Sequence, residues 1–387
     1  MKHLLLLLAI GSLITSGRAA HPYLADEAQT RAQFRDLCDF TVRERAQVAV
    51  IFTGGYYMRN LVAASQIFGD RRYLDVAVAY GDWLLERQSD RGYWQTGYAG
   101  RIYLADTGSA LGLFIVLHPH VDAARQRNYL AAMRRYVDAI ERDRLIRPSG
   151  ALDVGLRNDP GGAATVPYDQ DYTTSSCLTG GEIFTWMYHA TRQEKYREIA
   201  YRSQRWILST MREDGVIPYN HPGGKSDLRI QGNPKNDHML WVNSAYLNSA
   251  YVGEGLLSFD LHCGRSDWQQ EFRGKIKPHI DWVLRTQNPD GTWAPPGNWD
   301  QKRSPGIINF LLWYHRHVEA DPRVPAATRK FADFLADPAR ARTFGLLSAG
   351  AVPDPKDQQA VIGYDCVTGL TGRALADLLQ PGIETQW

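Results

Sequence analysis

The chain has 387 residues, of which 44% are hydrophobic and 11% aromatic, and its formal net charge at pH 7 is +2. This length suits one large domain or two ordinary ones, and the composition allows a substantial buried core. The nearly balanced charge gives no reason to expect nucleic acid or a membrane surface as a partner.

The first 24 residues, MKHLLLLLAIGSLITSGRAAHPYL, have a basic start, an apolar run and small residues at Ala19 and Ala20. This pattern is typical of a secretory signal peptide and is too short for a membrane span. We therefore expect residues 1–20 to be a cleaved leader and the protein to be secreted or periplasmic. The four cysteines contain no CxxC motif, so their pairing stays open: Cys38, Cys177, Cys263 and Cys366.

Helical periodicity dominates residues 21–387, and alternation typical of strands is scarce. Six segments are long, amphipathic and charged on one face: residues 24–46, 72–89, 122–143, 194–212, 266–286 and 325–336. Between them lie six segments rich in small and apolar residues, which open near residues 53, 106, 175, 248, 304 and 366. Each of these carries glycine in or near its first turns. Glycine costs up to about 1 kcal/mol in a helix, so close helix packing or a ligand near the helix ends should compensate.

The alternation of these two kinds of helix predicts a single all-α domain, an (α/α)6 toroid. The apolar helices form the inner ring and the amphipathic helices the outer ring. The long loops 144–175, 213–247 and 287–304 then gather at one end, before the inner helices begin. Long loops on one face commonly carry function.

One phrase recurs along the chain. DWLLERQSDRGYW (residues 82–94) and DWVLRTQNPDGTW (281–293) share the spacing of Trp, Gln and Gly, and WILSTMREDGVIPY begins a weaker copy at Trp206. Fixed spacing of this kind indicates a repeated supersecondary unit. The alternative is that three unrelated helix ends each happen to be followed by glycine.

This layout resembles the six-hairpin glycosidase-like superfamily, and more loosely its unsaturated glucuronyl and rhamnogalacturonyl hydrolases. LADTGSALGLF is similar to a segment in which those enzymes have a functional aspartate, which would assign that role to Asp106. DQDYTTSSCLTGGEIFTWMYHATRQEKYREIA is similar in outline to a second one, although Asp169 and Asp171 lie farther upstream of Trp186 than the pattern requires. The family's Arg-Gly-(Asn or Gln)-x-Trp signature is replaced by VNSAYVGEG. The resemblance spans about residues 50–265 and implies carbohydrate chemistry.

The candidate catalytic residues precede three inner helices. Asp106 opens the second one, where it also suits a helix cap. Asp169, Asp171 and Tyr172 precede the third, where neighbouring carboxylates would push one pKa upward, as a general acid requires. His238 precedes the fourth and titrates near neutrality. The alternatives are turns, caps and surface hydrogen bonds. No Cys or His spacing predicts a metal site.

The candidate substrate-binding residues are aromatic or charged and lie near the same end. Aromatic rings can stack on sugars, and cations can pair with a carboxylate or sulfate; the alternative is an apolar plug with a solvated charge pair. They are Tyr57, Trp94, Tyr168, Trp241, Trp293, Trp299, Lys302, Arg303, Tyr364 and Asp365.

The favoured hypothesis is an exported glycoside hydrolase that acts on a uronic-acid-containing glycan through Asp acid/base groups, without a cofactor. A polysaccharide lyase with a Tyr or His base is the main alternative. A non-catalytic glycan-binding toroid and a terpenoid-cyclase-like enzyme are two others. If the hydrolase hypothesis is right, Asp106, Asp169 and Asp171 should converge on one pocket. The oligomeric state stays open.

Overall fold

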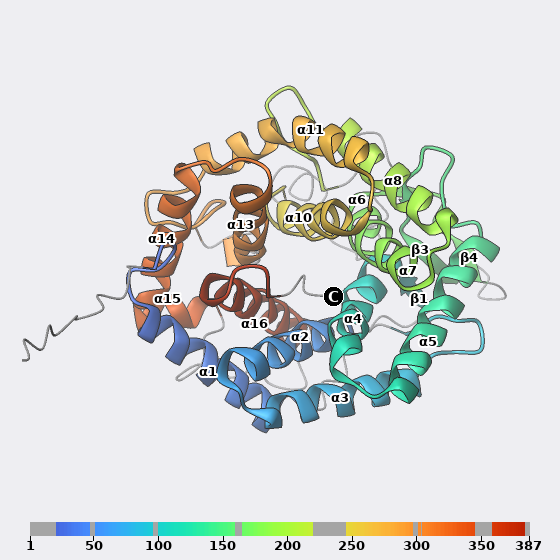
Figure 1. Cartoon of the computed structure of the whole chain (residues 1–387), viewed down its shortest axis with the longest axis horizontal. Coiled ribbons are helices and arrows are strands. Elements are labelled where there is room, and N and C mark those ends of the chain that lie inside the picture. Colours follow the sequence, from blue (N-terminus) through green and yellow to red (C-terminus); the bar gives the residue numbers. More distant parts are fainter. Residues whose placement is uncertain are drawn as a thin grey trace, which may run out of the picture.

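The computed structural model describes residues 21–46, 51–95, 100–158, 165–219, 245–296, 301–302, 304–344 and 358–383. Its long helices alternate between two rings, as predicted (Figure 1). The outer helices are α1 (Glu27–Glu44), α3 (Arg71–Leu85), α5 (Ala123–Arg142), α8 (Glu194–Ser209), α11 (Ser266–Arg285) and α14 (Arg323–Ala336). The inner helices are α2 (Ile51–Phe68), α4 (Leu104–Leu117), the composite α6 (Thr173–Ser175), η2 (Ser176–Ile183) and α7 (Phe184–Thr191), then α10 (Ala245–His262), α13 (Ile307–His317) and α16 (Gln358–Leu379).

The inner helices form a closed ring. Helix α2 contacts α4 on one side and α16 on the other, α4 contacts η2, and η2 contacts α10. The ring is completed by contacts from α10 to α13 and from α13 to α16. The fold is therefore the (α/α)6 toroid that the alternation predicts. Three short elements lie in the described parts of the connections: η1 (His118–His120), η4 (Ser304–Gly306) and α15 (Pro338–Thr343).

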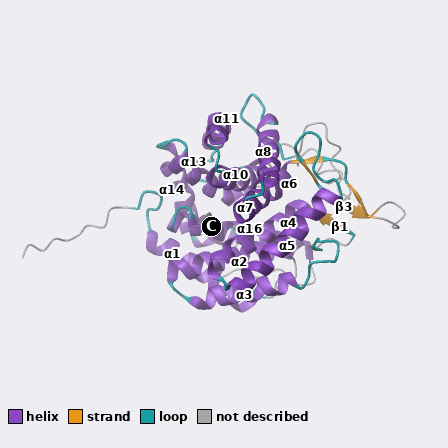
Figure 2. Cartoon of the chain, turned by 45° about the vertical axis from the view of Figure 1, so that its right-hand side comes forward, coloured by secondary structure: helices purple, strands orange, loops and turns teal. Residues whose placement is uncertain are grey.

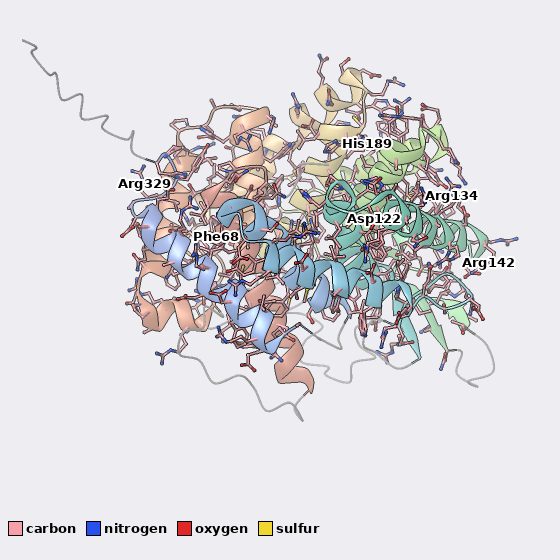
Figure 3. The ribbon with its side chains drawn as sticks, turned by 60° about the horizontal axis from the view of Figure 1, so that its bottom comes forward. Phe68, Asp122, Arg134, Arg142, His189 and Arg329 are labelled. Carbon is pink, nitrogen blue, oxygen red and sulfur yellow. The ribbon has the colours of Figure 1, made fainter. Side chains whose placement is uncertain are left out.

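The two rings differ in burial as their sequences do. Helix α5 buries Tyr129, Met133 and Tyr136 against the inner ring, whereas its Arg134 and Arg142 lie on the exposed outer side (Figure 3). Helix α4 is buried at nearly every position. A helix that is apolar all round is stable only when it is surrounded, so α4 belongs to the inner ring. No helix in the described ranges is both long and apolar enough to span a membrane.

Close helix packing explains the glycines of the inner helices. A Cβ added at Gly55 of α2 would lie 2.7 Å from the Ser109 carbonyl oxygen of α4. A Cβ at Gly181 of η2 would lie 2.6 Å from the Cα of Gly255 in α10. Neighbouring inner helices thus touch backbone to backbone, and this contact offsets the helix-forming cost of glycine.

The repeated phrase is a structural clamp at the end of an outer helix. In the first copy Gln88 donates through Nε2 to the Gly92 carbonyl at 2.9 Å and to the Ala132 carbonyl of α5 at 2.8 Å. In the last copy Gln287 makes the equivalent bonds, both of 2.8 Å, to Gly291 and to Ala327 of α14. The predicted repeat is therefore real, and it ties one outer helix to the next.

The tryptophans of this phrase are structural, so the prediction that Trp94 and Trp293 bind substrate is wrong. Trp94 is 1% exposed and donates through Nε1 to the Leu84 carbonyl at 2.8 Å. Trp293 is fully buried and donates in the same way to the Val283 carbonyl at 2.9 Å. A sugar cannot stack on a ring that is already enclosed by protein.

Two small sheets, β1-β3-β4 and β2-β5, lie at one side of the ring, where Figure 2 draws strands in orange. Their strands are β1 (Arg101–Tyr103), β2 (Leu152–Asp153), β3 (Gly155–Asn158), β4 (Thr165–Pro167) and β5 (Asp171–Tyr172). All pairs are antiparallel, with Ile102 opposite Leu156 and Leu152 opposite Tyr172. Strand β1 leads directly into α4 and β5 into α6, so the sheets hold the segments that enter two inner helices.

Two inner helices differ from expectation. The third contains π-helical turns over Ser176–Ile183. The sixth begins at Gln358, seven residues before Asp365. Asp365 therefore lies within α16, and the prediction that this helix opens near residue 366 is wrong.

Candidate active site at the mouth of the toroid

A cluster of tyrosines gathers near the N-terminal ends of the inner helices. We call Tyr56 of α2, Tyr172 of β5, Tyr219 after α8 and Tyr251 of α10 the tyrosine cluster. Tyr172 donates to the Tyr219 hydroxyl at 3.0 Å. Burial raises the pKa of Tyr251 well above its usual range, and the neighbouring Tyr56 raises it further. The four side chains come from distant parts of the sequence, and only closure of the ring unites them.

Asp106 lies beside this cluster. It is half-buried in the first turn of α4. Burial raises the pKa of Tyr172 well above its usual range, and the Tyr219 hydroxyl and the Asp106 charge raise it further. Burial likewise raises the pKa of Tyr219, with Asp106 contributing. Tyr172 and Tyr219 are therefore protonated at neutral pH and can donate hydrogen bonds to an anionic or ether oxygen placed next to Asp106.

The other two predicted catalytic carboxylates do not join Asp106. Asp169 forms an ion pair with Arg147, and Asp171 accepts from Arg147 Nε at 3.2 Å. Because neighbouring residues of a strand point to opposite faces, Asp171 turns away from the side of β5 that carries Tyr172. The predicted convergence of Asp106, Asp169 and Asp171 is therefore wrong.

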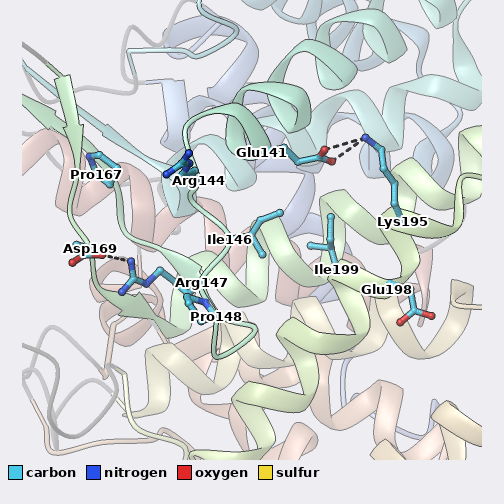
Figure 4. A pocket seen from close by; sticks show the side chains of 10 residues that line it. All are labelled: Glu141, Arg144, Ile146, Arg147, Pro148, Pro167, Asp169, Lys195, Glu198 and Ile199. Atoms are coloured by element: carbon cyan, nitrogen blue, oxygen red, sulfur yellow. Dashed lines mark hydrogen bonds and ion pairs between the residues drawn. The ribbon is translucent and has the colours of Figure 1, made fainter.

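Arg147 and Asp169 instead line a pocket in the outer wall, between the end of α5 and the start of α8 (Figure 4). Its volume is about 830 Å³. On its far side Lys195 pairs with Glu141 at 3.0 Å. Arg147 Nη1 also lies 3.7 Å from Asp153 Oδ2. Asp153 is fully buried and accepts from the backbone N–H groups of Gly155 and Gln170, each at 3.0 Å. Burial raises the pKa of Asp153 to about 6.

Tyr57 and Asp365, predicted to contact substrate, instead bond each other between helices. Both are fully buried, and the Tyr57 hydroxyl donates to Asp365 Oδ1 at 3.0 Å. Arg45, at the end of α1, pairs with the same carboxylate at 3.2 Å, and its guanidinium lies 5.9 Å from the ring centre of half-buried Tyr364. Burial raises the pKa of Asp365 to about 6 despite the nearby Arg45 charge. In this structure Tyr57 and Asp365 join α1, α2 and α16 and cannot touch a sugar.

A second buried set of charges was not predicted from the sequence. Arg59 of α2, Glu182 of η2, Glu254 of α10 and Arg373 of α16 meet inside the inner ring, each at most 4% exposed. The sequence did contain a signal for these residues, because each is a charged residue within an otherwise apolar helical segment. We call this set the buried charge cluster.

The remaining residues that the sequence analysis singled out differ in burial, and some of them lie outside the described residues. Tyr168 is 6% exposed and packs against Tyr103, with Arg157 over its ring. Lys302 is exposed. His238, Trp241, Trp299 and Arg303 lie outside the described residues. The four cysteines are free and buried. Within the described ranges, no three His, Cys, Asp or Glu side chains are grouped so that they could hold a metal ion.

The described helices form a six-hairpin toroid. Asp106 and the tyrosine cluster lie near the N-terminal ends of its inner helices, at the end that we call the mouth of the toroid. No family model and no curated protein sequence matches the chain. Solved structures do match it in fold. A possible member of the GH105 family from Salmonella enterica has 11% identity and a TM-score of 0.60, over 92% of this chain and 94% of that one.

Two further solved structures share the architecture. Unsaturated glucuronyl hydrolase from Bacillus sp. GL1, responsible for degradation of glycosaminoglycan, has 16% identity and a TM-score of 0.56, over 92% of this chain and 96% of that one. A polysaccharide lyase has 13% identity and a TM-score of 0.57, over 90% and 97%. The resemblance seen in the sequence is thus confirmed for the fold.

Proposed function

We propose that this protein is a glycoside hydrolase that cleaves a bond next to a uronic acid in an oligo- or polysaccharide, with Asp106 as its general acid/base. The observation that carries the proposal is the position of Asp106, in the first turn of inner helix α4 beside the paired hydroxyls of Tyr172 and Tyr219. The fold likeness to hydrolases of uronate-containing glycans supports it.

In the proposed reaction the Asp106 carboxyl protonates the leaving oxygen while the bond from that oxygen to the sugar carbon breaks. Water then bonds to this carbon and gives its proton to the Asp106 carboxylate, which restores the acid. The Tyr172 and Tyr219 hydroxyls hold the sugar in place by hydrogen bonds. Asp169 and Asp171 keep β5 in position through Arg147. His238 stays a candidate base or sugar contact.

β-Elimination is the competing reaction, because a polysaccharide lyase has the same fold. Its base would be Tyr172 or His238, and of these two only Tyr172 lies within the described residues. A tyrosine whose pKa is raised by burial and by a neighbouring carboxylate is a poor base at neutral pH. The surroundings of Tyr172 therefore favour hydrolysis.

We also propose that residues 1–20 are a signal peptide that directs export of the protein, as the sequence predicts.

The test of this function is a set of uronate-containing oligosaccharides whose products are weighed by mass spectrometry. Hydrolysis adds the mass of one water, whereas elimination adds none and creates an ultraviolet-absorbing unsaturated end. Asp106→Asn should lower turnover by about 10²–10⁴-fold, the usual contribution of a general acid, and the variant should remain folded.

The matched control is Asp122→Asn, which also replaces an aspartate at a helix start, where it accepts from the N–H groups of Ala124 and Arg125. This variant should keep normal turnover. Near-normal turnover of Asp106→Asn, together with an unsaturated product, would replace hydrolysis by elimination.

A further inference from the structure

The pocket in the outer wall lies directly behind the segment that leads into the third inner helix. Burial alternates along residues 167–172, where the even-numbered side chains are buried and the odd-numbered ones are not. The buried side chains include Tyr168, which packs on Tyr103, and Tyr172 of the tyrosine cluster. On the other side of the segment, Pro167 and Asp169 line the pocket. One extended segment therefore separates the pocket from the mouth of the toroid.

The charged wall of this pocket is balanced. It contains three cationic and three carboxylate side chains: Arg144, Arg147, Lys195, Glu141, Asp169 and Glu198. Lys195 is paired with Glu141, and Arg147 with Asp169. Arg144 and Glu198 are both exposed, and within the described ranges neither side chain has a hydrogen bond or ion pair. One group that donates hydrogen bonds and one that accepts them thus remain available to a ligand.

The pocket also has an apolar surface between its charged side chains. Four residues form it: Ile146, Pro148, Pro167 and Ile199. Figure 4 shows Ile146 and Ile199 between the side chains of Arg147 and Lys195. The volume of about 830 Å³ lies within the range of about 300–1,000 Å³ that is usual for small-molecule sites. The pocket can therefore enclose a small molecule that has both an apolar face and polar edges.

A sugar ring has this combination of surfaces. Its C–H groups form an apolar face, and its hydroxyl groups both donate and accept hydrogen bonds. Arginine and lysine side chains only donate and carboxylates only accept, so hydroxyl groups can bond with both. An inorganic anion would instead meet as many carboxylates as cations, and a purely apolar ligand would cover charged groups without giving them partners.

We propose that this pocket is a second carbohydrate site, which holds a sugar residue of the same glycan that is cleaved at the mouth. Ile146 and Ile199 lie against the face of the ring, and Arg144 and Glu198 bond its hydroxyl groups. The inference rests on the proposed function in one respect, namely that the bound sugar is part of the cleaved glycan. A chain that crosses residues 167–172 can contact both sites, because this segment is the boundary between them.

The test is an NMR titration of the full chain that follows isotope-labelled isoleucine methyl groups. The probes are the methyl glycosides of glucose, galactose, mannose and glucuronic acid, with inorganic phosphate for comparison. The signals of Ile146 and Ile199, identified with Ile146→Val and Ile199→Val, should shift in a saturable way with at least one glycoside and not with phosphate. A saturable shift with phosphate alone would make the pocket an anion site and overturn the inference.

Two variants test which side chains hold the sugar. Arg144→Ala and Glu198→Ala should each weaken glycoside binding by roughly tenfold or more, because each removes a hydrogen bond to a charged group. Arg142→Ala is the matched control, since Arg142 bonds the Asp143 carboxylate and the Arg91 carbonyl and lies outside the pocket lining. Its affinity should equal that of the unmodified protein. Unchanged affinity in both test variants would place the sugar elsewhere and overturn the second site.

The outcomes separate the two proposals. If no glycoside shifts the Ile146 and Ile199 signals while Asp106→Asn loses turnover, the second site is overturned and the proposed function stands. If glycosides bind in the pocket but no uronate-containing oligosaccharide is cleaved, the proposed function is overturned. The pocket then remains a carbohydrate-binding site, and only its link to a cleaved glycan is lost.

Discussion

Single residues near the mouth divide into those that can meet a substrate and those that hold the fold. Under the proposed function Asp106 belongs to the first kind: its carboxylate is half-buried and lies beside the hydroxyl pair of Tyr172 and Tyr219. Trp94 and Trp293 belong to the second, because their indole N–H groups are bonded to backbone carbonyls inside the core. Residue type alone does not separate the two kinds; burial and bonding partners do.

Trp293→Ala tests this division. Removing a fully buried aromatic side chain leaves a cavity and should lower the free energy of unfolding by about 3–5 kcal/mol, measured by urea denaturation. At a temperature where the variant is still folded, KM should change little. A large rise in KM with unchanged stability would instead show that Trp293 contacts substrate.

Among the elements, the turn that ends an outer helix is the repeated unit. Gly92, Gly215 and Gly291 all have φ between +91° and +94°, and each faces a backbone carbonyl of the next outer helix. Gly150 does the same against Arg202, although its sequence showed no copy of the phrase. The copy that begins at Trp206 has Met211 in place of the glutamine. There His279 Nδ1 lies 2.8 Å from the Gly215 carbonyl oxygen and takes the place of the missing side-chain amide.

Gly291→Ala should therefore be more destabilising than an ordinary glycine replacement. Its Cβ would lie 2.4 Å from the Lys330 carbonyl oxygen, in addition to the cost of a positive φ. Gly69→Ala is the matched control, because Gly69 has φ +67° and open space around it; this change should cost about 1–2 kcal/mol. Chemical denaturation of both variants gives the difference. Equal losses would mean that contact between outer helices adds nothing at this turn.

At the scale of the whole molecule, the ring closes where its first and last inner helices meet. Tyr57 of α2, Asp365 of α16 and Arg45 of α1 bond there, away from solvent. The folded state raises the pKa of Asp365 from 3.8 to about 6 and so binds the proton more tightly than the unfolded chain does. The resulting stability is fully present below pH 3.8 and is lost as the pH rises through 6.

Asp365→Asn should remove this part of the pH dependence, because an amide does not titrate. Between about pH 4 and pH 8, the free energy of unfolding of the original protein should fall by roughly 2–3 kcal/mol relative to that of the variant. Urea denaturation of both proteins at several pH values measures this difference. Parallel curves for the two proteins would refute the titration of Asp365 in the folded ring.

The sequence by itself determined the architecture, because two kinds of helix in strict alternation have one compact arrangement. It also located the repeated turn and predicted that Asp106 lies in the first turn of an inner helix. Only the tertiary structure decided how the charged residues are paired. Asp169 and Asp171 pair with Arg147 instead of facing Asp106, and β5 turns Asp171 away from the side that carries Tyr172. The buried charge cluster depends on four helices meeting across the ring. Helical periodicity reports which face is apolar, whereas the partner of a buried charge depends on contacts between residues far apart in the chain.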